Sequence, residues 1–242
     1  LREIVGDKPR LIVLNKADLA DDTATRAWVK YFAEQELVAV PVDAVKGRGV
    51  KELVQAIAKC AKPKTDKLVQ HGAKARAARC MILGIPNVGK SSLINRLSGG
   101  SKTKVENRPG VTRAKQWIRL GAQLELLDMP GILWPKFEDQ QAALHLAFTG
   151  AINDNVYDVA SVVLLLLDTL RRAYPSALIE RYRLEGALPS GIALLEEIGR
   201  KRGCLRAGGK IDYEKAEQIV LADFRSGRLG RVTLDDFPPI PT

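Results

Sequence analysis

The sequence has few cysteines and no long hydrophobic run, and both shortages narrow the classes of protein to consider. No apolar stretch reaches the ~18 residues that a membrane-spanning helix needs. The nearest candidate, residues 159–167, contains Ser161 and lies between Asp158 and Asp168. The three cysteines are widely spaced and form no CxxC pair, which argues against a disulfide scaffold or a zinc ribbon. The first residues do not form a signal peptide, so we expect a cytoplasmic protein with no membrane partner.

The rest of the composition is that of a folded protein with excess positive charge. The chain has 242 residues, of which 46% are hydrophobic and 27% charged, and its formal net charge is +10. This length allows one or two domains with a substantial core. Residues 59–79 contain seven basic residues and one acidic residue, and residues 171–210 contain nine and four. Such patches suit a polyanionic partner, but alone they do not distinguish RNA, an acidic membrane and a solvated surface.

The hydrophobic pattern divides the chain into two parts. In the first part, short apolar runs alternate with helical segments, which indicates an α/β domain with a mostly parallel sheet. Strands are expected at 11–14, 38–42, 80–83, 116–120 and 123–127, and helices at 23–36, 50–60 and 91–98. Asp22 or Thr23 could cap the first helix, and residues 62–79 form a linker or an exposed helix. The second part has helical spacing at 138–150, 156–173, 177–184, 191–202 and 213–226. We predict an α/β domain over 1–137, with a basic linker at about 60–79, and an all-α domain over 138–242.

Residues 84–91, Gly-Ile-Pro-Asn-Val-Gly-Lys-Ser, match the phosphate-loop pattern GxxxxGK[ST] between an expected strand and an expected helix. Glycines let the backbone turn its N–H groups toward a phosphate, and the following helix adds the positive end of its dipole. Lys90 can reach the β- and γ-phosphates and stabilise transition-state charge, and the Ser91 hydroxyl can bind Mg²⁺. The residues expected to contact the nucleotide are Asn87, Val88, Gly89, Lys90, Ser91 and Ser92.

Two further motifs fit the γ-phosphate side of such a site. Thr112, in Arg108-Pro-Gly-Val-Thr112, lies where a GTPase places the switch threonine that contacts Mg²⁺ and the γ-phosphate only in the triphosphate state. Asp128-Met-Pro-Gly131 matches DxxG, in which the aspartate holds Mg²⁺ through water and the Gly131 amide touches the γ-phosphate. We therefore expect Ser91, Thr112 and Asp128 around Mg²⁺, and Lys90, Thr112 and Gly131 in hydrolysis.

The motif Asn15-Lys-Ala-Asp18 matches NKxD and follows the first expected strand. A carboxylate at Asp18 can accept hydrogen bonds from both N1–H and the exocyclic amino group of guanine, and adenine offers no such donor pair. Lys16 would pack on the base plane, and Asn15 would tie neighbouring loops together. Asp43-Ala44, after the second expected strand, would offer an amide to guanine O6. These residues predict a guanine-binding site.

The order of these motifs is circularly permuted. In most GTPases the NKxD motif and the element that corresponds to Asp43-Ala44 come after DxxG, whereas here they precede the phosphate loop. A later candidate, Gly209-Lys-Ile-Asp212, lacks the asparagine and does not follow a strand. Moved termini need not change a site, because the spatial neighbours survive.

This permuted set resembles the bacterial ribosome biogenesis GTPase A family (RbgA/YlqF). The resemblance rests on residues 84–95, on residues 107–112 with Gln116-Trp117, and on residues 127–139, and it extends to 199–204 and 230–232. It implies a P-loop GTPase domain followed by an all-α domain that contacts 23S ribosomal RNA. It also implies a Mg²⁺-dependent switch that binds the precursor of the large (50S) subunit with GTP and leaves after hydrolysis. Hydrolysis would be slow alone and stimulated by the ribosomal particle, and Asn87 resembles an asparagine that helps to bind K⁺. We expect a monomer with no DNA partner.

Two departures from other GTPases bear on hydrolysis. Ile132 follows DxxG where many GTPases carry a glutamine, and an apolar side chain cannot orient water. The resemblance assigns this task to a histidine in an N-terminal segment that the chain, which opens with Leu1, does not contain; His71 and His145 match no such motif. We therefore expect one sheet strand to be missing and hydrolysis to be weaker than in a chain with that segment restored.

Three alternatives stay open from the sequence. The first is an RNA-binding module that a nucleotide controls, with negligible hydrolysis. The second is a permuted GTPase of small-subunit assembly, although such proteins carry an OB-fold and a zinc site, and this sequence has no cysteine–histidine cluster. The third is an ATPase, which requires the match at Asn15–Asp18 to be a coincidence.

Overall fold

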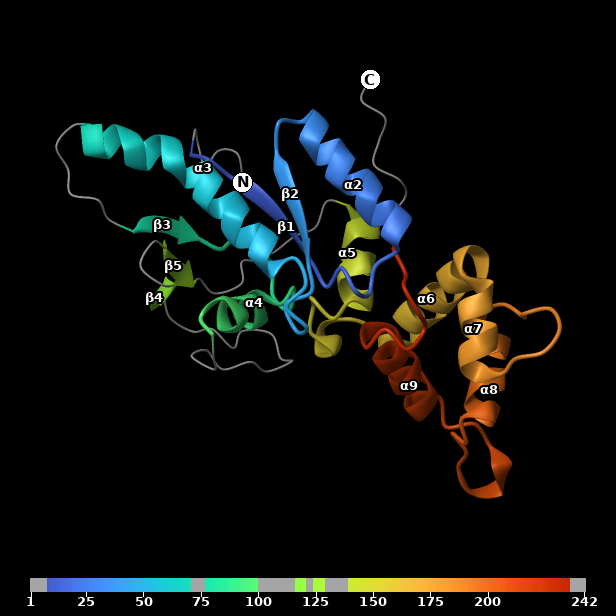
Figure 1. Ribbon diagram of the computed structural model, residues 1–242. Coiled ribbons are helices and arrows are strands. Elements are labelled where there is room, and N and C mark those ends of the chain that lie inside the picture. The colour runs from blue at the N-terminus through green and yellow to red at the C-terminus, as the bar shows by residue number, and fades with distance from the viewer. Residues whose placement is uncertain (1–7, 71–76, 100–115, 121–123, 129–138, 236–242) are drawn as a thin grey trace. The chain divides into compact units, whose positions relative to one another are not determined.

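The structure is a computed structural model of the chain (Figure 1), and it describes residues 8–70, 77–99, 116–120, 124–128 and 139–235. The chain divides into two compact units, Leu1–Leu133 with Asp235–Thr242 and Trp134–Leu234. The domain boundary predicted at residue 137 lies outside the described residues. No helix in the described ranges has both the length and the apolar character needed to span a membrane.

The described strands of the first unit form two small sheets. β1 (Leu11–Asn15) pairs in parallel with β2 (Val38–Val42). β3 (Ala78–Met81) pairs in parallel with β5 (Leu124–Asp128), whose other edge pairs antiparallel with β4 (Gln116–Leu120). Two of these three pairings are parallel, which agrees with the predicted mostly parallel strands. The described strands lie in two sheets, however, where the sequence indicated one.

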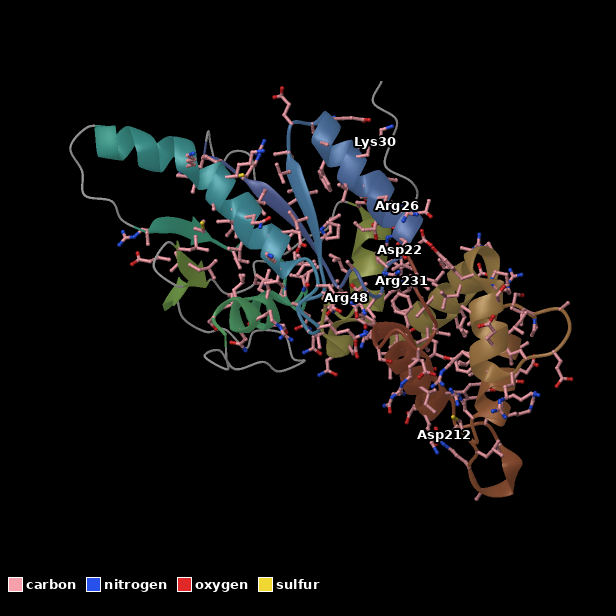
Figure 2. The ribbon with its side chains drawn as sticks, in the orientation of Figure 1. Asp22, Arg26, Lys30, Arg48, Asp212 and Arg231 are labelled. Carbon is pink, nitrogen blue, oxygen red and sulfur yellow. The ribbon has the colours of Figure 1, made fainter. Side chains whose placement is uncertain are left out.

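Three helices accompany these strands: α2 (Asp22–Glu34), α3 (Val50–Gln70) and α4 (Lys90–Leu97). Both α2 and α3 pack against the β1–β2 pair (Figure 1). The predicted cap of α2 was wrong by one residue, because Asp21 accepts the hydrogen bond from the Ala24 amide at 2.8 Å. The exposed Asp22, Arg26 and Lys30 follow one another along α2 at four-residue spacing (Figure 2), so this stripe of the helix faces water.

The basic segment after residue 60 is partly helical. α3 continues through Pro63 to Gln70, so the first half of the region predicted as a linker or an exposed helix is helical. A proline removes one backbone hydrogen bond from a helix interior, but its neighbours here are mainly lysine and alanine, which favour helix.

The phosphate-loop helix α4 joins the two sheets through two consecutive residues. Leu93 packs in a cluster with Val40, Val42 and Leu53, which covers the β1–β2 pair. The next residue, Ile94, is fully buried and packs with Leu126 of β5. Consecutive residues of a helix point about 100° apart, so one short helix can contact both clusters. The loop that precedes α4 is therefore anchored to both sheets.

The second unit is helical over its described residues, 139–234. Its helices are α5 (Gln140–Phe148), α6 (Val159–Ala173), α7 (Pro175–Tyr182), α8 (Gly191–Lys201) and α9 (Tyr213–Arg225), with 3₁₀ turns η1 (Asp154–Val156) and η2 (Ala207–Gly209). The apolar stretch of α6 supplies the centre of the core, where Val163, Leu166, Leu167 and Leu170 are fully buried. The five predicted helices are present with shifted ends. The predicted start at residue 156 was wrong, because Asp158 caps α6 through the Ser161 amide.

Arg225 of α9 ties the end of α5 to η1. Its Nε donates to the carbonyl of Phe148 at 3.0 Å, and its Nη2 donates to the carbonyl of Ala147 at 2.8 Å. The last carbonyls of a helix have no partner within the helix, so Arg225 satisfies two of them. The same guanidinium donates to both carboxylate oxygens of Asp154 at 2.9 and 2.8 Å. These hydrogen bonds lower the pKa of Asp154 from its usual value.

We expect Arg225→Met to destabilise the chain by about 2 kcal/mol at pH 7, because it removes the donor of the Phe148 carbonyl and the charged partner of the Asp154 carboxylate. The free energy of unfolding can be measured in urea by circular dichroism. Arg172→Met, which removes a more exposed i,i+4 ion pair with Asp168, is the control and should cost less than about 0.5 kcal/mol.

The pH dependence of this difference tests the ion pair. A carboxylate whose pKa is lower in the folded state contributes stability above its unfolded pKa and loses it as the pH falls through the folded pKa. The loss of unfolding free energy caused by Arg225→Met should therefore become smaller as the pH falls below the usual pKa of an aspartate, about 3.9. A cost that stays constant down to pH 3 would mean that the carbonyl contacts alone carry the effect.

Candidate functional site

Three loops of the first unit meet at the side chain of Asn15. Asn15 is the last residue of β1, and its Nδ2 donates to the carbonyl of Val88 in the phosphate loop at 2.8 Å. Its Oδ1 accepts from the amide of Ala44, which follows β2, at 3.4 Å. The carboxyl ends of parallel strands lie at one edge of a sheet, where α/β proteins bind ligands. One amide group thus brings the NKxD motif, the Asp43-Ala44 element and the phosphate loop to one place.

The phosphate loop has the backbone conformation that its glycine pattern predicts. Asn87 and Gly89 have positive φ angles of 56° and 92°. A Cβ atom on Gly89 would lie 2.3 Å from Asn15 Nδ2, so only glycine allows the junction with Asn15 at this position. Gly89 also caps α4, which places Lys90, Ser91 and Ser92 in the first turn of the helix. The amides of such a turn lack partners within the helix and can bind an anion.

Lys90 folds back over the loop that it follows. Its Nζ donates to the carbonyls of Gly84 at 2.9 Å and Ile85 at 2.7 Å. The ammonium group is therefore held at the phosphate loop by main-chain oxygens, and a phosphate oxygen with a full negative charge is a stronger acceptor for it.

The turn that carries Asp18 is fixed to the neighbouring strand. The amide of Ala17 donates to the carbonyl of Val42 at 3.1 Å, and the amide of Leu19 donates to the carbonyl of Lys16 at 2.9 Å. Lys16 has a positive φ of 58°, the left-handed conformation that closes such turns. Asp18 is half-buried in this turn, and the hydrogen bonds position the turn beside the end of β2.

Asp43 organises its own loop. The residue is 3% exposed, and its Oδ1 accepts from the amides of Val45 at 3.0 Å and Lys46 at 2.8 Å. This is the aspartate turn typical of loop starts. The other oxygen, Oδ2, is buried without a hydrogen-bond partner among the described residues. Such an orphan acceptor costs free energy unless water or a bound molecule donates to it.

Arg96 is a site residue that the motif analysis missed. It lies on α4, and its Nε donates to the carbonyl of Ala44 at 3.1 Å, while its Nη2 donates to the carbonyl of Val45. The helix that begins with Lys90 therefore also holds the loop after β2. The sequence contained a weak indication of this contact. Arg96 follows the buried Leu93 by three residues and therefore lies on the same face of the helix.

The γ-phosphate side is described only in part. Thr112, Gly131 and Ile132 lie outside the described residues, and of Asp128 only the backbone position is described. The register pairs Met81 with Leu127, and the Ile82 amide donates to the Leu127 carbonyl at 3.3 Å. Asp128 therefore lies at the sheet edge where the phosphate loop begins. The Ser91 hydroxyl and an aspartate carboxylate are oxygen donors of the kind that Mg²⁺ prefers, so these residues fit that ion.

The two histidines lie elsewhere. His71 is outside the described residues, and His145 is on α5 of the second unit, with its ring centroid 6.1 Å from that of Phe148. His145 is thus a helix residue near an aromatic ring.

Comparison with known proteins adds evidence from outside this chain. Residues 79–190 match the family model described as 50S ribosome-binding GTPase. This match begins at β3 and the phosphate loop, and it leaves out Asn15–Asp18, which agrees with a permuted motif order. The ribosome biogenesis GTPase A of Bacillus cereus is 48% identical over 96% of this chain and 79% of its own length. The protein of that name from Thermotoga maritima is 30% identical over 96% and 79%.

Solved structures similar to this chain carry the same family name as these relatives. A GDP-bound structure of YlqF matches with a TM-score of 0.63 and 28% identity, over 93% of this chain and 82% of that one. A GNP-bound YlqF from T. maritima matches with a TM-score of 0.62 and 27% identity, over 95% and 82%. The predicted P-loop GTPase fold and its permuted order are confirmed, and the similarity includes both units. The chain belongs to the ribosome biogenesis GTPase A family.

Proposed function

We propose that this GTPase is a switch in the assembly of the large ribosomal subunit, which binds the pre-ribosomal particle with GTP and leaves after hydrolysis. Membership of the family makes the chain a GTP-hydrolysing enzyme of ribosome biogenesis. The observation that carries the proposal is the junction at Asn15, where the guanine-binding motif contacts the phosphate loop. This contact lets residues at the two ends of a permuted domain bind one nucleotide.

The guanine base lies, in this proposal, between the turn after β1 and the loop after β2. The Asp18 carboxylate accepts from N1–H and from the exocyclic amino group, and the Lys16 stem packs on the base plane. The Ala44 amide donates to guanine O6. Its bond to Asn15 Oδ1 is long at 3.4 Å, so little is lost when a better acceptor arrives.

The phosphates lie along residues 87–92. The amides of the loop and of the first turn of α4 bind the phosphate oxygens, and Lys90 exchanges its two carbonyl partners for the β- and γ-phosphates. Ser91, Thr112 and Asp128 hold Mg²⁺, which neutralises charge on the β- and γ-phosphates. Thr112 and Gly131 contact the γ-phosphate and are released when it leaves. The K⁺ site predicted at Asn87 stays a prediction.

The partner in this proposal is the RNA of the large subunit. The net charge of +10 favours a polyanion, and the matching family model is described as 50S ribosome-binding. The chain acts as a monomer in the cytoplasm.

Co-sedimentation with purified ribosomal subunits tests the proposal. We expect binding to the large subunit that is at least about tenfold tighter with a non-hydrolysable GTP analogue than with GDP, which corresponds to a coupling of 1.4 kcal/mol. The small subunit is the control, and a second salt concentration separates specific binding from general attraction to RNA. Equal binding with both nucleotides, or a preference for the small subunit, would contradict the proposal.

A further inference from the structure

The second unit contains a buried carboxylate that three arginines share. Asp223 of α9 is 1% exposed. Arg181 donates to both of its oxygens, from Nε at 2.8 Å and from Nη2 at 2.7 Å. Arg202 and Arg228 also donate to it, at 3.4 and 3.3 Å. Burial opposes ionisation of Asp223, but the hydrogen bonds from Arg181 and Arg228 hold its pKa below the usual value.

This arrangement leaves an excess of positive charge, because one carboxylate faces three guanidinium groups. Like charges brought together repel one another unless an anion compensates them. Asp223 is the only acidic group that the described residues show in hydrogen-bond contact with Arg181, Arg202 or Arg228. A second anion that reached the free side of these arginines would therefore be bound favourably.

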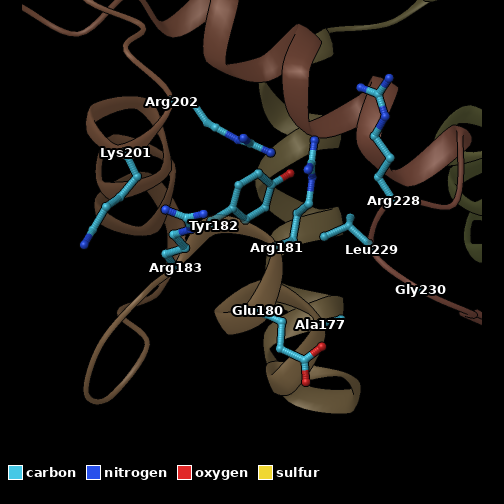
Figure 3. Close-up of a pocket in the computed structure, with 10 residues that line it drawn as sticks. All are labelled: Ala177, Glu180, Arg181, Tyr182, Arg183, Lys201, Arg202, Arg228, Leu229 and Gly230. Atoms are coloured by element: carbon cyan, nitrogen blue, oxygen red, sulfur yellow. The ribbon is translucent and has the colours of Figure 1, made fainter.

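The three arginines open onto a pocket of about 640 Å³. Arg183 and Lys201 add to its lining, and Glu180 is the acidic residue there (Figure 3). The walls come from the ends of α7 and α8 and from the segment after α9. The charge of the pocket is thus strongly positive, and all of its lining belongs to the second unit.

Two buried polar groups lie in the same wall. Tyr182 is 2% exposed and lines the pocket, and its hydroxyl lies near the Asp223 carboxylate. Figure 3 shows this hydroxyl between the guanidinium groups of Arg181 and Arg202. Arg202 lies over the Tyr182 ring, with 5.3 Å from its Cζ to the ring centroid, and its Nε is buried without a hydrogen-bond partner among the described residues. Burial raises the pKa of Tyr182, and the charge of Asp223 and the interaction of its carboxylate with the hydroxyl raise it further, so the hydroxyl keeps its proton at neutral pH.

We propose that this pocket binds a phosphate group of the RNA backbone. Guanidinium groups match the geometry of phosphate oxygens, and a tyrosine hydroxyl can donate to the same group. Arg183 and Lys201 lie at its exposed rim, where a neighbouring phosphate of the same strand would come within reach. The proposal rests on the proposed function for the identity of the polyanion, and it names the place on the helical unit where RNA is held.

The test compares two double variants that lose the same charge. Arg183→Ala with Lys201→Ala removes the two rim cations, neither of which has a hydrogen bond to Asp223, so the buried cluster stays intact. Lys210→Ala with Lys215→Ala is the matched control, because both lysines are exposed on the same unit and neither lines the pocket. Thermal unfolding by circular dichroism checks that both variants fold.

Fluorescence anisotropy with a labelled single-stranded RNA, at several KCl concentrations, gives the affinity and its salt dependence. We expect the rim variant to bind about tenfold more weakly, with a salt slope smaller by about 0.7 for each lost phosphate contact. The control variant should bind within about twofold of the unaltered chain, as expected for exposed charges away from the binding site. Equal losses in both variants would show general attraction to surface charge and would overturn the proposal, as would no loss in either.

Two further arms separate related outcomes. Calorimetric titration with inorganic phosphate tests whether the pocket binds free phosphate instead of RNA. If the rim variant loses phosphate binding but keeps the RNA affinity of the unaltered chain, the proposal is overturned. Co-sedimentation of the unaltered chain with the large subunit tests the proposed function separately. If the chain does not bind the large subunit while its RNA affinity still depends on Arg183 and Lys201, the proposed function is wrong and the phosphate-binding pocket is supported.

Discussion

Replacing Lys90 with alanine is expected to lower the rate of GTP hydrolysis at least about a hundredfold, because removal of one donor to transition-state charge commonly has that effect. The Lys90 ammonium lies at the phosphate loop, where it donates to the carbonyls of Gly84 and Ile85. No other cation of the described residues replaces it in that contact. Single-turnover hydrolysis at saturating GTP and Mg²⁺ measures the effect on the chemical step.

Lys30→Ala is the control for this experiment. Its side chain is 82% exposed on α2, and its removal should leave the rate unchanged. A Lys90→Ala rate within about threefold of the unaltered chain would contradict the assigned role, since a lost catalytic donor costs far more. If the unaltered chain itself turned over no faster than Lys90→Ala, the alternative of a nucleotide-controlled RNA-binding module would be favoured.

Asp18→Asn is expected to change the preferred base from guanine to xanthine. In the proposed site the Asp18 carboxylate accepts two hydrogen bonds from guanine, whereas an asparagine offers one acceptor and one donor group. The amide can donate to the carbonyl that xanthine carries in place of the amino group of guanine. Because a site built for specific hydrogen bonds rejects a mismatched ligand strongly, GDP affinity should fall at least about a hundredfold while XDP affinity rises.

Competition of GDP and XDP against a fluorescent guanine nucleotide measures both affinities. Asp22→Asn is the control, because Asp22 is exposed in the first turn of α2 and should not discriminate the bases. Equal weakening of GDP and XDP by Asp18→Asn would show that Asp18 acts on the conformation of its turn and not on the base. Tight ADP binding by the unaltered chain would favour the ATPase alternative.

Local sequence signals predicted the elements of the site well. The pattern Gly-x-x-x-x-Gly-Lys-Ser fixes both the positive φ of Gly89 and the start of α4, because each property depends on residues within a few positions. Asn15 was expected to join loops, and it contacts both Val88 and Ala44. That expectation came from the motif and not from the local pattern, since Val88 is 73 residues away.

The long-range contacts of charged side chains could not be predicted from the sequence. Arg96 and Asp223 each look like ordinary polar residues of a helix, yet one holds the loop after β2 and the other gathers three arginines. Such partners depend on how elements pack, and helical periodicity alone does not encode them. The case of α3 is different, because the sequence left residues 62–79 open between a linker and an exposed helix. The lysine- and alanine-rich neighbours of Pro63 continue the helix to Gln70.

The permuted order of the motifs also fixes the order in which the partners Asn15 and Val88 are made during translation. The chain emerges from its amino end, so β1, α2 and β2 are made well before the phosphate loop. Until α4 follows, Asn15 lacks its partner and the cluster around Val42 lacks Leu93. A GTPase with the usual motif order makes its phosphate loop first and its guanine-binding motif last. In this chain β1 and β2 are made before the phosphate loop, and the eight-residue helix α4 supplies both Leu93 and the first turn that follows this loop. β5, which packs on Ile94, is made only later.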